Sequence, residues 1–472
     1  MSAIENRIKR LMSISVRAGH DGNLNKPVKF ESMRNPKFKV RFVQISAVVL
    51  LALWSTIMVL AQTKHAYYVA KNGDDSNPCT LTLPCATFNR VRTLPMPGDT
   101  VYVRGGDYTG SLIKLGATGV QNGTDWSEGS GAITWKAYNS EIVWVGSVEA
   151  NNAYYIFDGI NIDGSALHSF GLGMYADHVL FKNAEIRNAV YDGISGASFG
   201  PGVPTYHYTI NLKVHDNGNT DPSPPAVQHH GYYLDGGDYN LIEYCDFYNH
   251  KNAMTESYGI QLFDNTFGSM PSHNILRFNK FHDNGRGIFV GSGASNNQIY
   301  NNLVYNNLAS GVDVGSGTNN QLYNNTIYGN GGFGVQMVTS TGALVKNNLI
   351  ANSGSYDVYI WGAGAMNDRA TLLNNLTTKG ISDFGNATTL SGNITGSPKL
   401  VDPAAGNFHL LQGSIAIGAG VNLISFFTTD FAGIARPAAS GFDIGAYQYG
   451  TSTPPAGDAV APTISLRMAP HQ

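Results

Sequence analysis

Asparagine recurs at a fixed interval in the second half of the chain. Two sets keep the same constant step, one made of Asn279, Asn302, Asn325 and Asn348 and the other of Asn284, Asn307 and Asn330. A fixed period in the twenties is the signature of a solenoid, in which one repeat cannot bury its apolar side without its neighbours. We therefore expect stacked coils, each placing its asparagines over those of the preceding coil.

Within each period, short apolar bursts are separated by asparagine, glycine and serine. Aligned periods share the skeleton N-x-[IL]-x-x-N, then [IFV]-x-x-N, then G-[IV]-x-[VM]. This order predicts three short strands joined by tight turns, and no segment has helical spacing. A buried turn asparagine can donate to and accept from the same turn in adjacent coils, so the two sets are interpreted as structural ladders.

The repeats are flanked by an opening and a closing segment. Residues 67–78 and 97–108 open the repeat region, and residues 430–449 close it. Together with the repeats they resemble the right-handed parallel β-helix proteins of the pectate-lyase-like superfamily. The resemblance implies an all-β, single-stranded right-handed parallel β-helix at positions 62–450, with coils of roughly 23 residues. It also implies an N-terminal cap and a C-terminal coil at 430–449, and we expect a cap helix at 86–93. The high glycine content and the low share of charged residues are also typical of stacked strands joined by tight turns.

Positions 1–61 form a basic and then apolar leader. They carry ten Lys or Arg against three acidic residues, followed by an apolar run at 45–61. This predicts a signal peptide cleaved after Ala61, with an N-terminal membrane anchor as the alternative. A start at Met33 would also give an ordinary signal peptide, so translation of residues 1–32 stays open. Residues 451–472 are predicted to be a Pro-rich linker and the start of an immunoglobulin-like module.

The cysteines are consistent with a protein that is exported. Cys79 and Cys85 enclose five residues and are predicted to form a disulfide in an oxidising compartment, with two free thiols as the alternative. Cys245 falls where the alignment places a ladder asparagine, so it is predicted to be buried and inert. The expected location is secreted, periplasmic or on the cell surface.

The net charge of the protein limits which classes of partner it can bind. The chain has 30 basic and 33 acidic residues, and without the leader 20 and 30 remain. Nucleic acid is therefore excluded as a partner, because its binding depends on clustered Lys and Arg. For the same reason, polyanionic sugars are poor partners unless a local basic patch or bound calcium offsets the negative charge of the protein.

Two coils carry insertions at the same point of the repeat. They lie between Asn217 and Gly231 and between Asn249 and Gly259. Two adjacent loops on a rigid scaffold would wall a groove over the strand that follows them. Strand alternation predicts an outward column of Tyr233, Gln261, Phe289, Asp313 and Gln336. Aromatic and amide groups suit sugar rings, so we expect these residues and His229 to bind a polysaccharide or cell-surface glycan; the alternative is an ordinary solvated sheet.

Ionisable residues are predicted at the rim of this groove. A lyase acting on a uronic sugar needs a base and a cation that stabilises the enolate-like intermediate. The candidates are Lys251 or His230 as base, Arg286 as the cation, and Glu256 beside them. Each is otherwise an ordinary loop residue.

A calcium site is predicted in a neighbouring turn. Asp235 and Asp238 carry hard oxygen ligands for calcium, although aspartates in glycine-rich turns also serve as turn formers.

No catalytic set can be transferred from related enzymes. The N-T-D, D-D, G-H-G and R-I-K set of polygalacturonases, the D-P-H-D signature of alginate epimerases and the paired arginines of pectate lyases are absent. Two hypotheses remain. One is a secreted polysaccharide-binding protein that cleaves a uronic-acid glycan by β-elimination. The other is a non-catalytic surface or matrix protein that binds glycans or forms a rigid scaffold.

Overall fold

The computed structural model describes residues 64–196, 205–219, 228–250, 256–263, 270–291, 293–361 and 369–450. The predicted leader and the predicted C-terminal module lie outside these ranges, so both stay predictions. Within the described ranges, no helix combines the length and the apolar character needed to cross a membrane.

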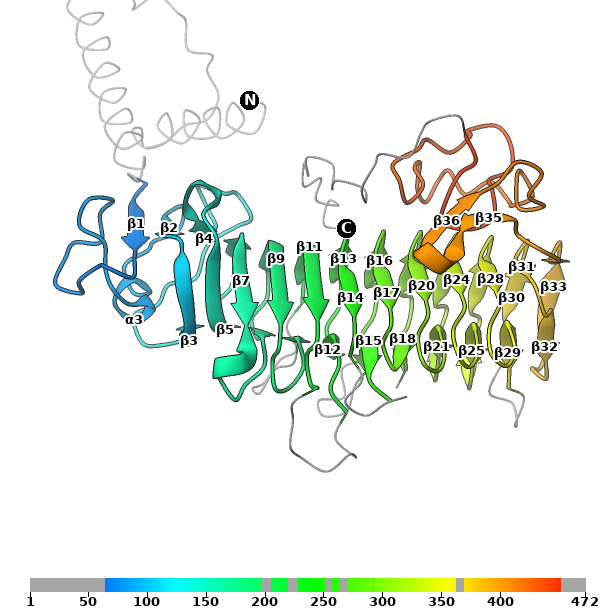
Figure 1. Cartoon of the computed structure of the whole chain (residues 1–472), viewed down its shortest axis with the longest axis horizontal. Helices are drawn as coiled ribbons and strands as arrows, with labels where there is room; N and C mark the ends of the chain where they lie inside the picture. Colours follow the sequence, from blue (N-terminus) through cyan, green and yellow to red (C-terminus); the bar gives the residue numbers. More distant parts are fainter. Residues whose placement is uncertain are drawn as a thin grey trace, which may run out of the picture. The chain divides into compact units, whose positions relative to one another are not determined.

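The described chain is a parallel β-helix, as the repeats predicted (Figure 1). Each regular coil gives one short strand to each of three faces, and each strand pairs in parallel with its counterpart in the next coil. Face 1 contains β1 (Ala66–Val69), β2 (Thr100–Val103), β4 (Ile133–Ala137), β6 (Tyr155–Asp158), β9 (Val179–Arg187), β11 (Tyr208–His215), β13 (Leu241–Glu243), β16 (Ile275–Arg277), β19 (Gln298–Tyr300), β23 (Gln321–Tyr323), β27 (Leu344–Lys346), β30 (Thr371–Leu373) and β33 (Thr389–Ser391).

Faces 2 and 3 follow in each coil. Face 2 contains β3 (Gly106–Lys114), β5 (Val143–Ala150), β7 (Ile160–Asp163), the second halves of β9 and β11, β14 (Asp246–Tyr248), β17 (Lys280–His282), β20 (Leu303–Tyr305), β24 (Thr326–Tyr328), β28 (Leu349–Ala351), β31 (Leu376–Thr377) and β34 (Ile394–Thr395). Face 3 contains the end of β5, β8 (Leu172–Met174), β10 (Ile194–Ser195), β12 (Tyr232–Asp235), β15 (Tyr258–Phe263), β18 (Arg286–Val290), β21 (Val312–Val314), β25 (Val335–Met337), β29 (Val358–Ile360) and β32 (Ile381–Asp383). The smaller elements are β22 (Gly317–Thr318) paired with β26 (Ser340–Thr341), and the 3-10 turns η2 (Tyr138–Ser140), η3 (Gly164–Ala166) and η4 (Pro403–Ala405).

The turn between faces 1 and 2 explains the asparagine doublets of the repeat. Asn301 and Asn324 adopt left-handed backbone conformations, with φ of 53° and 48°. Asparagine tolerates this region better than most residues with a Cβ, so the first member of each doublet turns the chain. The second member, Asn302 or Asn325, points inward and is fully buried.

The asparagine ladders are confirmed. Asn325 Oδ1 accepts hydrogen bonds from the backbone N–H and from Nδ2 of Asn302, both at 3.0 Å. Asn302 Nδ2 also donates to Leu276 O at 2.9 Å. The same pattern joins the other predicted ladder residues, and the first ladder continues from Asn348 into Asn375 and Asn393. A third ladder that was not predicted precedes face 1, formed by Asn240, Asn274, Asn297 and Asn320.

Other residue types replace asparagine in two ladder positions. Cys245 is buried and its backbone N–H donates to Asn279 Oδ1 at 2.9 Å, as predicted from the alignment. Burial raises the pKa of its thiol to about 12, so it stays protonated and unreactive. His250 takes the corresponding place above Asn284, with Nδ1 2.9 Å from the amide oxygen.

The N-terminal end is capped by a helix shorter than predicted. The helix α3 spans Phe88–Val91 instead of residues 86–93. It begins there because the Thr87 hydroxyl accepts the N–H of Arg90, and Pro95 prevents its continuation. Phe88 and Val91 are buried in the core, and the predicted Cys79–Cys85 disulfide is present.

The prediction of a C-terminal coil at 430–449 is wrong. After β34 the chain turns back and runs outside the solenoid, where β35 (Leu400–Asp402) and β36 (Asn407–Leu410) form an antiparallel pair (Figure 1). Phe408 packs on Leu303 of face 2, and Phe427 stacks on Tyr300 of face 1 at 5.0 Å. The buried Arg436 donates to Asn301 Oδ1 at 2.8 Å. This return segment covers faces 1 and 2 in the later coils and leaves the outer side of face 3 uncovered by the described residues.

Candidate functional site

The outer side of face 3 carries the predicted column. Parallel pairing sets Tyr233 beside Gln261, Gln261 beside Phe289, Phe289 beside Asp313 and Asp313 beside Gln336. The alternate residues of these strands fill the core. Tyr233, Phe289 and Gln336 are half-buried, whereas Gln261 and Asp313 are only 6% exposed. The expectation that all five line an open groove is therefore wrong for Gln261 and Asp313, because side chains of adjacent coils cover them.

A charge network crosses this column. Arg286 Nη1 donates to Asp313 Oδ2 at 2.8 Å, and Nη2 donates to Glu256 Oε1 at 2.9 Å. The Arg286 guanidinium also lies 5.7 Å from the ring centroid of Tyr258, whose ring stacks on Phe289 at 5.1 Å. The structure thus brings together two of the predicted ionisable residues, Arg286 and Glu256, next to two aromatic rings.

The two carboxylates of this network, Asp313 and Glu256, differ in their burial. Burial raises the pKa of Asp313, and the adjacent Arg286 opposes the shift. The side chain of Glu256 is 44% exposed and faces solvent.

The two histidines lie deeper than predicted. His229 and His230 are 6% and 4% exposed, so neither is a rim residue. His230 Nδ1 accepts the backbone N–H of Tyr258 at 3.0 Å, which assigns the ring proton to Nε2. Burial, together with the charges of His229 and His250, lowers the pKa of His230 to about 3. With its lone pair engaged, His230 fits a neutral hydrogen-bond donor better than the predicted base.

A buried carboxyl supports this histidine pair. Asp192 Oδ1 accepts the backbone N–H of His230 at 2.5 Å and lies 4.0 Å from His229 Nδ1. Burial raises the pKa of Asp192 to about 7. The sequence did not single out Asp192, although it occupies the position before a glycine that His230 occupies one coil later.

Lys251 lies outside the described residues, as do parts of both predicted loops, 220–227 and 251–255. The predicted role of Lys251 as a base therefore stays a prediction.

Of the predicted calcium residues, Asp235 ends β12 and Asp238 lies in the turn that follows. Asp235 is buried, and Asp238 Oδ1 accepts the backbone N–H of Ser272 at 2.7 Å. Gly236 and Gly237 have φ of 81° and 89°, as a tight glycine turn requires. Across the described ranges, no three His, Cys, Asp or Glu side chains are grouped so that they could hold a metal ion. The calcium site stays a prediction, and Asp238 has a structural role in the turn.

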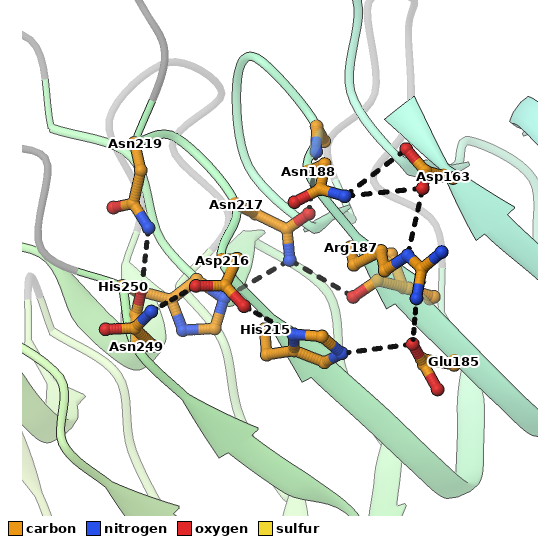
Figure 2. Close-up of polar contacts among 12 residues, drawn as sticks. Asp163, Glu185, Arg187, Asn188, His215, Asp216, Asn217, Asn219, Asn249 and His250 are labelled. Carbon is orange, nitrogen blue, oxygen red and sulfur yellow. Dashed lines mark hydrogen bonds and ion pairs between the residues drawn. The ribbon is translucent and has the colours of Figure 1, made fainter. Parts of the chain in front are cut away.

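A second polar network, which the sequence did not reveal, lies on the outer side of face 2 (Figure 2). Arg187 binds Asp163 at 2.9 Å and Glu185 at 3.0 Å, and His215 lies between Glu185 at 3.3 Å and Asp216 at 2.7 Å. The coils that build this network are 24 to 34 residues long, as the separations of its contacts show. An alignment at the constant step of the later coils therefore does not bring its members together.

The network continues along the solenoid axis. His215 stacks on Tyr248 at 4.6 Å, Tyr248 on His282 at 5.2 Å, and His282 on Tyr305 at 4.7 Å. His282 repeats the environment of His215, with Asp246 at 3.0 Å and Asp283 at 2.7 Å. Both ring nitrogens of each histidine thus already face a carboxylate.

Comparison with known proteins supports the fold. A family model described as a right handed beta helix region matches residues 203–377. The solved structure of pectate lyase Pel9A is 17% identical, with 82% of this chain and 97% of that chain covered and a TM-score of 0.53. The structure of XylC in complex with xylose is 14% identical, with 81% and 98% covered and a TM-score of 0.54. No curated protein sequence matches the chain. The protein therefore has a right-handed parallel β-helix fold.

Proposed function

We propose that the protein binds an extracellular polysaccharide along the outer side of face 3. The observation that carries the proposal is the Arg286 network set against the stacked rings of Tyr258 and Phe289. Rings offer surfaces to the CH groups of sugars, and the charged and amide groups offer hydrogen bonds to hydroxyls.

Three further observations support this choice. Faces 1 and 2 are covered by the return segment in the later coils, so face 3 is the side on which a long polymer can lie. By their names, one of the two proteins of similar fold is a pectate lyase and the other was solved with xylose, so both are linked to glycans or sugars. The Cys79–Cys85 disulfide supports a location in an oxidising compartment, where such polymers occur.

Eliminative cleavage of a uronic-acid glycan is the second candidate. Arg286 favours it, because a guanidinium in this position would bind a uronate carboxylate and stabilise the developing enolate. The uronate would have to displace Glu256, the more exposed of the two carboxylates that Arg286 binds. Lys251 stays the predicted base, and His230 Nε2–H would serve as a hydrogen-bond donor.

Binding and cleavage can be tested with the full chain. Affinity electrophoresis in gels that contain pectate, alginate, chondroitin or xylan measures binding, and the ultraviolet absorbance of the unsaturated uronate measures elimination, each with and without calcium. The test variant is Arg286→Gln. The matched control is Arg277→Gln on face 1, because Arg277 also pairs with a buried carboxylate, that of Glu243, at 2.6 Å.

The outcomes separate the candidates. Retardation by a polysaccharide that Arg286→Gln weakens and Arg277→Gln does not would support binding on face 3. An absorbance increase that Arg286→Gln abolishes would add elimination, whereas binding without an increase leaves a non-catalytic glycan-binding protein. Absence of retardation by every polysaccharide would refute the proposal.

A further inference from the structure

Exposed aromatic side chains gather on face 3 beyond the Arg286 network. Tyr356, Trp361 and Phe384 are 45%, 44% and 62% exposed, and the half-buried Phe333 and Tyr359 lie beside them. Solvent-exposed clusters of large apolar groups on one surface mark interaction sites. We call these five residues the aromatic platform.

The rings of the platform lie close together. Phe333 lies 5.0 Å from Tyr359, and Tyr356 lies 5.5 Å from Tyr359, with interplanar angles of 23° and 28°. Phe384 adds a tilted ring 5.9 Å from Tyr359. Trp361 follows β29 and pairs through its backbone N–H with Met337 O in the preceding coil. The platform therefore spans the coils of β25, β29 and β32.

The platform continues the proposed binding surface. Tyr359 pairs in register with Gln336, and Gln336 pairs with Asp313, the partner of Arg286. Adjacent parallel strands lie about 4.8 Å apart, so Tyr359 lies two coils, or about 10 Å, from Asp313. A polymer that lies along the solenoid axis would contact both regions.

The charged side chains beside the platform indicate which kind of sugar it can bind. Among the described residues, the cation nearest in the column of Tyr356 is Lys379, and its Nζ is engaged with the carbonyls of Ser353 and Gly354. The carboxylate of Asp357 is buried and accepts the backbone N–H of Lys379 at 2.7 Å. The uncharged residues Gln336 and Ser382 flank Tyr359. This surface offers rings and hydroxyl partners. Of the two exposed described cations beside it, Lys379 directs its Nζ at the carbonyls of Ser353, Gly354 and Ser355, and Arg369 lies beyond Trp361 in the turn before β30.

We infer that the aromatic platform binds uncharged sugar residues of the polysaccharide, stacking them on Tyr356, Trp361 and Phe384. The inference rests on the proposed function and adds the chemical class of the sugars at this end of face 3.

The test uses the full chain and the triple variant Tyr356→Ala/Trp361→Ala/Phe384→Ala in gels that contain xylan, glucomannan, pectate or alginate. The matched control is Tyr239→Ala, because Tyr239 is 47% exposed and stacked on a neighbouring ring but lies in the turn before face 1. We expect the triple variant to bind xylan or glucomannan about tenfold or more weakly, as for loss of aromatic anchors at other interfaces. The control should bind like the wild type.

Other outcomes overturn the inference. Neutral polysaccharides that do not retard the wild-type chain, or that retard the triple variant equally, would refute the platform. If pectate still binds in an Arg286-dependent way, the proposed function survives that failure. Size-exclusion chromatography with light scattering completes the test, because a wild-type dimer that the triple variant converts to a monomer, with glycan binding unchanged, would show that a second copy occupies the platform.

Discussion

Replacing a ladder asparagine by a residue of similar size should destabilise the solenoid from within. In Asn302→Leu, the N–H and Nδ2 of Asn279 lose their acceptor, and Leu276 O loses a donor. Stranding a buried backbone group costs about 1–3 kcal/mol, so two such groups give a gross loss of about 2–6 kcal/mol. Burial of the leucine side chain returns about 1.5–3 kcal/mol. We expect a net loss of roughly 1–3 kcal/mol.

Two measurements test this estimate. Urea unfolding reports the loss of stability, and hydrogen exchange of the Asn279 amide reports the local hydrogen bond, which should open about 5- to 150-fold more often for a loss of that size. The control is Asn393→Leu at the last coil, where the ladder residue is only half-buried and water can replace its hydrogen bonds. An unchanged urea midpoint together with unchanged Asn279 exchange would show that the ladder contributes nothing to stability.

Three further predictions concern titration and the cap. Burial lowers the pKa of His282, but the hydrogen bonds and charges of its two carboxylate neighbours raise it overall. The stabilisation by His282 should be complete below the unfolded pKa of about 6.5 and disappear as the pH rises through the higher folded pKa. The urea midpoint should therefore fall as the pH rises above about 6.5, and less so in His282→Gln. Asp192 has a raised pKa of about 7 through burial, so its ionisation penalises the folded state increasingly from about pH 4 to pH 7. The variant Asp192→Asn keeps the acceptor for the N–H of His230. At about pH 8 its free energy of unfolding should exceed that of the wild type by up to a few kcal/mol, whereas near pH 4 the two should differ little. Equal urea midpoints at both pH values would contradict the burial argument. Replacing Cys79 and Cys85 by serine should cost about 2 kcal/mol, because the disulfide closes a short loop, and calorimetry of oxidised and reduced protein provides the comparison.

The regular part of the fold could be predicted because its period is visible in the residues. The constant step between asparagines predicted the ladders, and strand alternation predicted the column from Tyr233 to Gln336. Alternation does not report how neighbouring coils cover a side chain, so the burial of Gln261 and Asp313 was not predictable. The return segment was also missed, because contacts such as Arg436 with Asn301 span 135 residues and leave no period.

The site followed from sequence only where residues stay in register. Arg286 and Glu256 were both predicted at the rim of the groove, Glu256 within the second insertion and Arg286 in the following coil, and the structure pairs them directly. The His230 tautomer depends on a backbone N–H from the next coil, which composition and spacing do not encode. The network of His215 arises from coils of unequal length, so its partners cannot be aligned at one step.

The two polar surfaces of the solenoid differ in a way that bears on function. On face 2, both ring nitrogens of His215 and of His282 already bind carboxylates, so that network is satisfied within the protein. On face 3, the rings of Tyr356, Trp361 and Phe384 stay exposed. Exposed rings gain free energy when the CH groups of a ligand cover them, whereas a network satisfied within the protein gains little from a ligand. The same scaffold thus separates an ion network that stabilises the coils from a surface suited to a sugar polymer.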